Sequence, residues 1–209
     1  LYLGGDVVLD RVLTDNLTTF KLVEDATVTR NQGFTLGGLD LDNSTFTLGS
    51  ATTDLTIDIG DSSDNGTDSG LPPGTLATQT ADLTVVGTVN LSSGTTISST
   101  GGTFTFGEGL SISGATVNLQ DSTLALGGSF SNTGGSLTLS GTDLELLSNL
   151  SLGSDAAFTV DELRLEDKTL NLQSVSSFTV AEQLVLDNAN EQVTWDNTSL
   201  ALNGGLKPV

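Results

Sequence analysis

The sequence predicts an all-β protein: a right-handed parallel β-solenoid (β-helix) of triangular cross-section with about 20 residues per coil. Three observations support this prediction. Apolar pairs recur with one shared period, turn-forming residues separate the pairs, and the composition suits short strands. The chain of 209 residues has 25 glycines, 3 prolines and 5% aromatic residues, which is typical of many short strands around a core of Leu, Val and Ile.

Pairs of apolar residues, separated by a single residue, recur in three interleaved series after residue 80, with steps of 19 to 21 residues. The pairs of the first series begin at Leu83, Phe104, Leu124, Leu144, Leu163 and Leu184. Those of the second begin at Val89, Leu110, Phe130, Leu150 and Leu170. Those of the third begin at Ile97, Val117, Leu137, Phe158 and Phe178. Each pair predicts a short strand with two inward side chains, stacked on the next coil at ~4.8 Å. The usual hand of parallel crossovers makes the coil right-handed.

The segments between pairs are rich in residues that tolerate sharp turns, as in "GEG", "SGA", "NTGG" and "SGTD". We expect these segments at the corners of the coil. An ordinary β-sandwich is the alternative, although it does not require a 20-residue period.

The first half of the chain repeats less regularly. Its apolar pairs are Phe20/Leu22, Phe34/Leu36, Leu39/Leu41, Phe46/Leu48 and Leu55/Ile57, preceded by Leu1/Leu3 and Val7/Leu9. The pattern stops over 58–80, an acidic stretch with two of the three prolines, which predicts a loop inserted at one corner. We therefore expect a single solenoid domain over 1–209, with about ten coils.

The charge of the chain excludes several partners. Its formal net charge is −20, and no Lys or Arg lies between Arg30 and Arg164. Binding to nucleic acid or anionic lipid depends on clustered cations, so neither partner is expected. No apolar run is long enough to span a membrane, which predicts no membrane insertion. The chain has no Cys and no His, which removes thiolate ligands and the commonest general base. The acidity suits divalent cations, or else serves solubility alone.

The acidic loop contains a candidate calcium site. Its oxygen-bearing residues are Asp58, Asp61, Ser63, Asp64, Asn65 and Asp68, and Gly66 follows as in the first half of a calcium loop. Pro72 stands where such a loop carries its bidentate Glu. Calcium is the one cofactor that the sequence suggests, and a solvated acidic loop is the alternative.

Outward residues of the third series form a row of small polar side chains. These residues are Ser98, Asn118, Thr138, Thr159 and Thr179, with Thr194 as a looser continuation. A flat hydroxyl array suits an ice-binding surface, but Thr also favours any exposed strand. Ice binding therefore stays an alternative.

Acidic residues that could act in carbohydrate hydrolysis are scattered over the predicted corners and faces. The acidic candidates are Asp143, Glu145, Asp161, Glu162, Glu166 and Asp167. We expect Arg164 and Lys168 to form surface ion pairs with them, and Trp195 to point inward beside Val193. Sugar hydrolysis needs paired carboxylates in a cleft, so we predict no enzyme. A carbohydrate-active or carbohydrate-binding β-helix is the alternative function.

Six Asn-x-Ser/Thr sequons are candidate glycosylation sites: Asn16, Asn43, Asn65, Asn90, Asn149 and Asn197.

The units "SNTGGSLTLSG" and "LELLSNLSLGSDAAFTV" resemble bacterial adhesins of the filamentous-haemagglutinin type, over roughly residues 81–202. The Asn-Pro-Asn-Leu signature of that family's secretion domain is absent. The resemblance implies an elongated extracellular protein at the cell surface, with host or surface glycans as candidate partners and no catalytic residues.

Both ends of the sequence carry the strand pattern, "LYLGGDVVLD" and "TSLALNGGLKPV". An uncapped coil exposes apolar side chains and strand edges. We expect an extracellular structural protein: a filament subunit that stacks head to tail on itself, or a rod segment joined to flanking parts of a surface adhesin.

Overall fold

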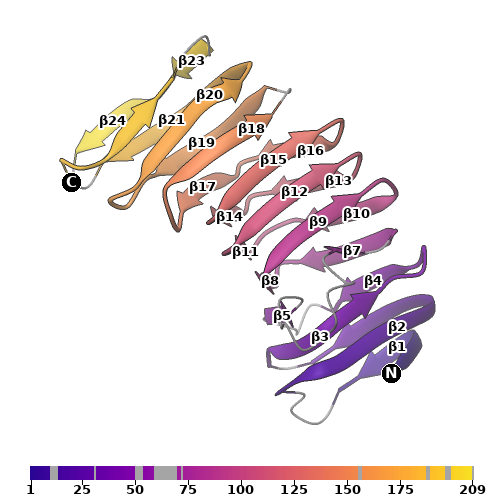
Figure 1. The fold of residues 1–209 in the computed structure, drawn as a ribbon. Helices are drawn as coiled ribbons and strands as arrows, with labels where there is room; N and C mark the ends of the chain where they lie inside the picture. The colour runs from indigo at the N-terminus through magenta and orange to yellow at the C-terminus, as the bar shows by residue number, and fades with distance from the viewer. Residues whose placement is uncertain are drawn as a thin grey trace.

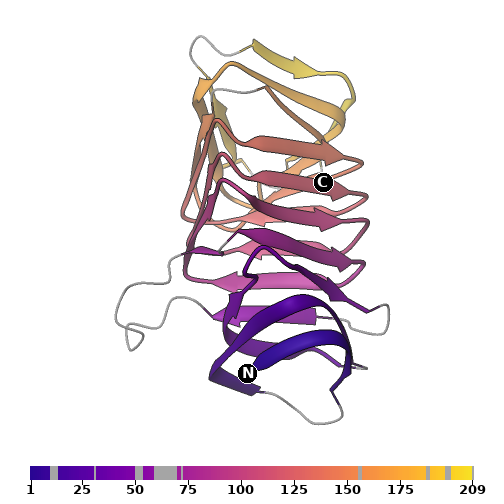
Figure 2. The same cartoon turned by 90° about the vertical axis from the view of Figure 1, so that its right-hand side faces the viewer.

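The computed structural model is a stack of β-coils with its termini at opposite ends (Figures 1 and 2). It describes residues 1–9, 14–30, 32–49, 54–58, 70–71, 73–154, 157–186, 189–195 and 199–208. Within these ranges there is no helix, and the named strands pair in parallel. The coils form about 8 turns, about 21 residues apart, which confirms the predicted β-solenoid. The sequence pattern suggested about ten.

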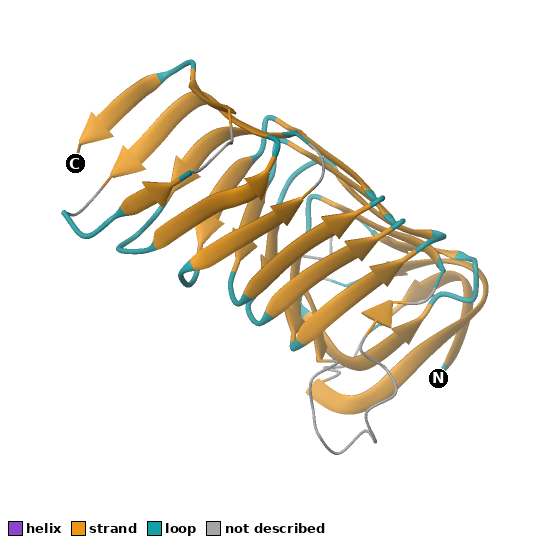
Figure 3. Ribbon diagram, turned by 45° about the horizontal axis from the view of Figure 1, so that its top comes forward, coloured by secondary structure: helices purple, strands orange, loops and turns teal. Residues whose placement is uncertain are grey.

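Three ladders of parallel strands form the sides of the coil (Figure 3). The first face holds β5 (Asp54–Asp58), β8 (Asp82–Val86), β11 (Thr103–Phe106), β14 (Thr123–Leu126), β17 (Asp143–Leu146) and β24 (Gly205–Pro208). The second holds β6 (Gly70–Leu71), β9 (Thr88–Ser92), β12 (Gly109–Ser113), β15 (Ser129–Thr133), β18 (Leu150–Ser154), β20 (Thr169–Val175) and β22 (Gln192–Thr194). The third holds β4 (Thr45–Leu48), β7 (Gly74–Gln79), β10 (Thr95–Ser99), β13 (Thr116–Gln120), β16 (Ser136–Ser140) and β23 (Ser199–Leu202).

Longer strands run from one face to the next without a break. They are β1 (Tyr2–Val8), β2 (Thr14–Thr29), β3 (Phe34–Asp40), β19 (Phe158–Arg164) and β21 (Ser177–Leu186). Register irregularities at the bends let β2 and β19 turn from face to face. These strands lie at the two ends of the rod, and the coils between them have tighter corners.

The three predicted series lie on the three faces. On the first face every predicted step is a register pair, from Leu83 with Phe104 through to Leu163 with Leu184. On the second face the prediction is wrong at one step, because Phe130 pairs with Leu152 and not with Leu150. A shift of two residues keeps the same side chains inward, so the apolar pattern could not reveal it.

Inward pairs form one continuous core along the axis. The first-half pairs Phe34/Leu36, Phe46/Leu48 and Leu55/Ile57 are buried as predicted. A fully buried side chain of this kind contributes about 1.5–3 kcal/mol relative to an exposed one. Because a coil is one strand thick, each side chain is covered by the tiers above and below it. Stability therefore depends on contact between neighbouring coils.

Left-handed glycines form one corner of the central coils. Gly94, Gly114 and Gly134 have φ angles of 91°, 75° and 67° and follow one another at steps of 20 residues. A side chain is strained in this region of φ, so glycine allows a tight turn at the same place in each coil.

The predicted corner loop over 58–80 ends earlier than expected. Residues 59–69 and 72 lie outside the described residues, but β6 and β7 fall within the predicted loop. Strand β7 is a regular tier between β4 and β10. Its inward positions hold Gly74, Leu76 and Thr78, so a single apolar residue marks the tier and the sequence pattern misses it.

Candidate functional site

The last coil of the rod leaves the core open. An apolar cavity of about 170 Å³ lies there, lined by Leu184, Leu186, Val193, Trp195, Leu200 and Leu202 among others. Trp195 and Leu206 are 53% and 63% exposed. The prediction that Trp195 points inward is therefore half right: it lines the core cavity beside Val193 but remains open to solvent.

The strands of this coil also present free edges. Strand β22 pairs with β20, and β23 and β24 pair with β21; within the described ranges, none has a partner on its outer side. Unpaired strand edges beside exposed apolar side chains are the features that another parallel β-coil would cover.

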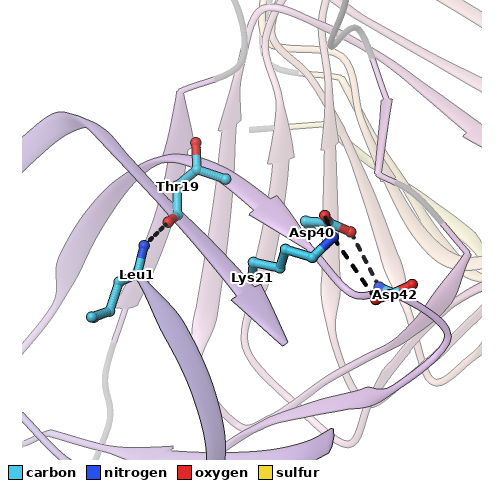
Figure 4. Close-up of polar contacts among 5 residues, drawn as sticks. All are labelled: Leu1, Thr19, Lys21, Asp40 and Asp42. Atoms are coloured by element: carbon cyan, nitrogen blue, oxygen red, sulfur yellow. Dashed lines mark hydrogen bonds and ion pairs between the residues drawn. The ribbon is translucent and has the colours of Figure 1, made fainter. Parts of the chain in front are cut away.

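The N-terminal coil lies at the other end of the stack. Tyr2 and Val8 are exposed there, but they alternate with the more buried Leu3 and Val7 and so face outward from the side of the coil. Lys21 Nζ lies 2.8 Å from Asp40 Oδ2 and 3.8 Å from Asp42 Oδ2 (Figure 4). The hydrogen bond to Asp40 and then its charge raise the pKa of Lys21. The Leu1 ammonium donates to the Thr19 carbonyl at 2.7 Å. These polar contacts join the first coil to the second and the second to the third.

The predicted row of outward hydroxyl groups on the third face is interrupted. Ser98, Asn118 and Thr138 are in register, and so are Thr159 and Thr179, but no described pairing joins Thr138 to Thr159. The predicted continuation at Thr194 is wrong. Thr194 lies on the second face beside Asn171, and Ala201 follows Thr179.

A longer threonine row lies on the first face. Thr35, Thr56, Thr84 and Thr105 follow one another in register, and Ala125 ends the row. The signal was present in the sequence, because each is the middle residue of an apolar pair. It was missed since the first two pairs lie in the irregular half of the chain.

A polar groove of about 480 Å³ runs along the corner between the third and first faces. Its acidic lining residues are Asp121, Asp143, Asp161 and Glu182. Burial raises the pKa of the Asp143 carboxyl, and the charge of Glu162 raises it further. Two of the acids predicted to be scattered, Asp143 and Asp161, thus meet in one groove.

The remaining acids of that set lie elsewhere. Glu145 is the middle residue of an inward pair and faces outward on the first face. Glu166 and Asp167 form the turn before β20. Arg164 pairs with Glu162 as predicted, whereas the Lys168 ammonium donates to the Glu166 carbonyl at 2.7 Å. Sugar binding would favour an aromatic side chain beside the acids, and the residues that line this groove include none.

Of the candidate calcium residues, the structure describes only Asp58. Asp58 ends β5, and Asp61, Ser63, Asp64, Asn65 and Asp68 lie outside the described residues. Among the residues that the structure does describe, no group of three or more acids is arranged to hold a metal ion.

The structure describes the side-chain environment of three of the six sequons. Asn43 and Asn90 are exposed, and Asn43 lies in a turn with φ of 66°. Asn149 is exposed, but its Oδ1 accepts a hydrogen bond from the Thr169 amide at 2.9 Å. Asn65 and Asn197 lie outside the described residues, as does the side chain of Asn16.

Comparison with protein-family models, with curated proteins and with solved structures finds no match. The residues that the structure describes include no helical segment that could span a lipid bilayer.

Proposed function

We propose that the chain is an extracellular structural rod whose ends are covered by further β-coils. The covering coils come from a second copy, in a filament that stacks head to tail, or from flanking parts of a larger surface adhesin. The observation that supports this is the open last coil, with its apolar cavity and free strand edges. Head-to-tail contact of this kind does not close on itself and extends into fibres.

The chemistry of the last coil suits parallel stacking. Coils inside the rod join through parallel ladders around an apolar core, and the last coil presents the same kinds of surface to solvent. A further coil would bury Trp195 and Leu206, at a gain of about 1.5–3 kcal/mol for each side chain covered fully. The charge of −20 opposes lateral clustering of rods, which favours growth along the axis.

Negative-stain electron microscopy of the purified chain tests the proposal. We expect filaments one solenoid wide at high concentration, and their loss in Leu206→Glu. The matched control is Leu147→Glu, which changes a 39% exposed leucine on the side of the rod and should leave filaments intact. Short single rods in the native chain would favour the adhesin segment. Compact round particles, or filaments that survive Leu206→Glu, would contradict end-to-end stacking.

Two further experiments test the role of calcium in assembly and the cellular location of the protein. Imaging with calcium and with a chelator shows whether the acidic segment at 58–68 contributes to assembly. Antibody labelling of intact cells of the source organism tests the extracellular location, and labelling only after lysis would contradict it.

Ice binding is a second candidate, favoured by the in-register threonine row on the first face. The row is four described tiers long before Ala125 and Glu145 end it, so we place this function second. Thermal hysteresis of the native chain, and its loss in Thr84→Lys, would establish it.

A further inference from the structure

The ladders between coils are incomplete at one boundary, where the coil of β15–β17 meets the coil of β18 and β19 (Figure 1). At the preceding boundary, all three faces pair over four or five residues. Here the second face pairs three residues, from Phe130 with Leu152 to Asn132 with Ser154. The first face pairs two, Leu144 with Leu163 and Glu145 with Arg164. On the third face, no ladder joins the described residues of β16 and β19. We call this boundary the seam.

The core is also loose at the seam. A cavity of about 200 Å³ lies between Leu137 and Leu139 on one side and Phe158 on the other. Both leucines are half-buried, whereas Val117 and Leu119, at the same positions one coil earlier, are buried. Successive backbone amides of a strand point to opposite sides, so about half of those in β16 point toward the seam without a ladder partner.

The second face carries a register shift at the same boundary. Phe130 pairs with Leu152, two residues beyond the step that the repeat predicts. The row of left-handed glycines at the corner between the second and third faces ends at Gly134.

We propose that the seam divides the rod into two cooperative units, residues 1–147 and 150–208, and that the second unit unfolds first. In a stacked repeat protein, units cooperate only through the contacts between neighbouring coils. The second unit has fewer coils, and it contains the open cavity at Trp195. A load along the rod would therefore release the second unit and leave the first intact. The inference follows from the fold alone and holds for a filament subunit and an adhesin segment alike.

Urea unfolding of the full chain tests this division, because the chain has a single tryptophan and Trp195 lies in the second unit. We expect its fluorescence to change at a lower urea concentration than the main circular dichroism transition, which the larger first unit dominates. Phe178→Leu and Phe104→Leu are matched changes of fully buried phenylalanines, one in each unit. The first should lower only the fluorescence midpoint, and the second only the main dichroism midpoint.

Coincident transitions, with both variants shifting both signals equally, would overturn the proposal. Hydrogen exchange separates unfolding of the unit from fraying of the last coil. At the urea concentration where the fluorescence change is complete, amides of β18–β20 should have exchanged while those of β10 and β13 remain protected. Protection of β18–β20 at that point would also refute the two-unit division.

Discussion

Two buried threonines should respond in opposite directions to the same substitution. Thr142 and Thr78 are 0% and 1% exposed, and both lie in the unit 1–147. The Thr142 hydroxyl donates to the Leu119 carbonyl at 3.1 Å. The Thr78 hydroxyl has no hydrogen-bond partner within the described structure. Replacement by valine keeps the size and the β-branch and removes only the hydroxyl, so the two sites differ in hydrogen bonding alone.

The expected magnitudes follow from these contacts. Thr142→Val loses a buried hydrogen bond, which costs about 1 kcal/mol of unfolding free energy. Thr78→Val removes a buried hydroxyl that has lost its contact with water, which should stabilise by about 1 kcal/mol. The two variants should therefore differ by about 2 kcal/mol. For a chain of this length that separates their melting temperatures by about 4–8 °C, with Thr78→Val the higher.

Urea and thermal unfolding followed by circular dichroism measure the difference. We expect the midpoints of the native chain to lie between those of the two variants. If both variants destabilise equally, the hydroxyl of Thr78 is hydrogen-bonded in solution. If both are neutral, burial of a hydroxyl in this narrow core carries no net cost. Either outcome would refute the reasoning.

Two further predictions concern a corner and the acidic groove. Gly128→Ala should destabilise by more than about 1 kcal/mol, because φ is 63° and a Cβ would collide with the Glu108 carbonyl, whereas Gly107→Ala has open space and should be nearly neutral in the same melts. Asp143→Asn should raise the urea midpoint at pH 7, since burial raises the pKa of this carboxyl and its ionised form costs stability there. That advantage should disappear below the ordinary value of 3.8, where the native side chain is neutral in both states; a constant or opposite difference would contradict it.

Much of the fold could be predicted because a strand alternates its side chains and a solenoid repeats the same tier. The first-series pairs from Leu83 to Leu184 therefore predict the register of that part of the first face. Tiers such as β7 were missed because Thr78 and Gly74 occupy inward positions where the pattern expects apolar residues. The candidate calcium site stays a prediction, since its residues after Asp58 lie outside those described.

Local alternation and composition are enough to predict that the chain coils, which side chains turn inward, and that the surface is strongly acidic. How well each coil packs on the next depends on contacts between residues about 20 positions apart, which the coordinates of neighbouring coils reveal. The pairing of Phe130 with Leu152, the gap between Thr138 and Thr159, and the meeting of Asp143 with Asp161 all depend on offsets between coils. An offset of two residues leaves the alternation unchanged, so it is invisible in sequence and appears only when neighbouring tiers must share hydrogen bonds and a core.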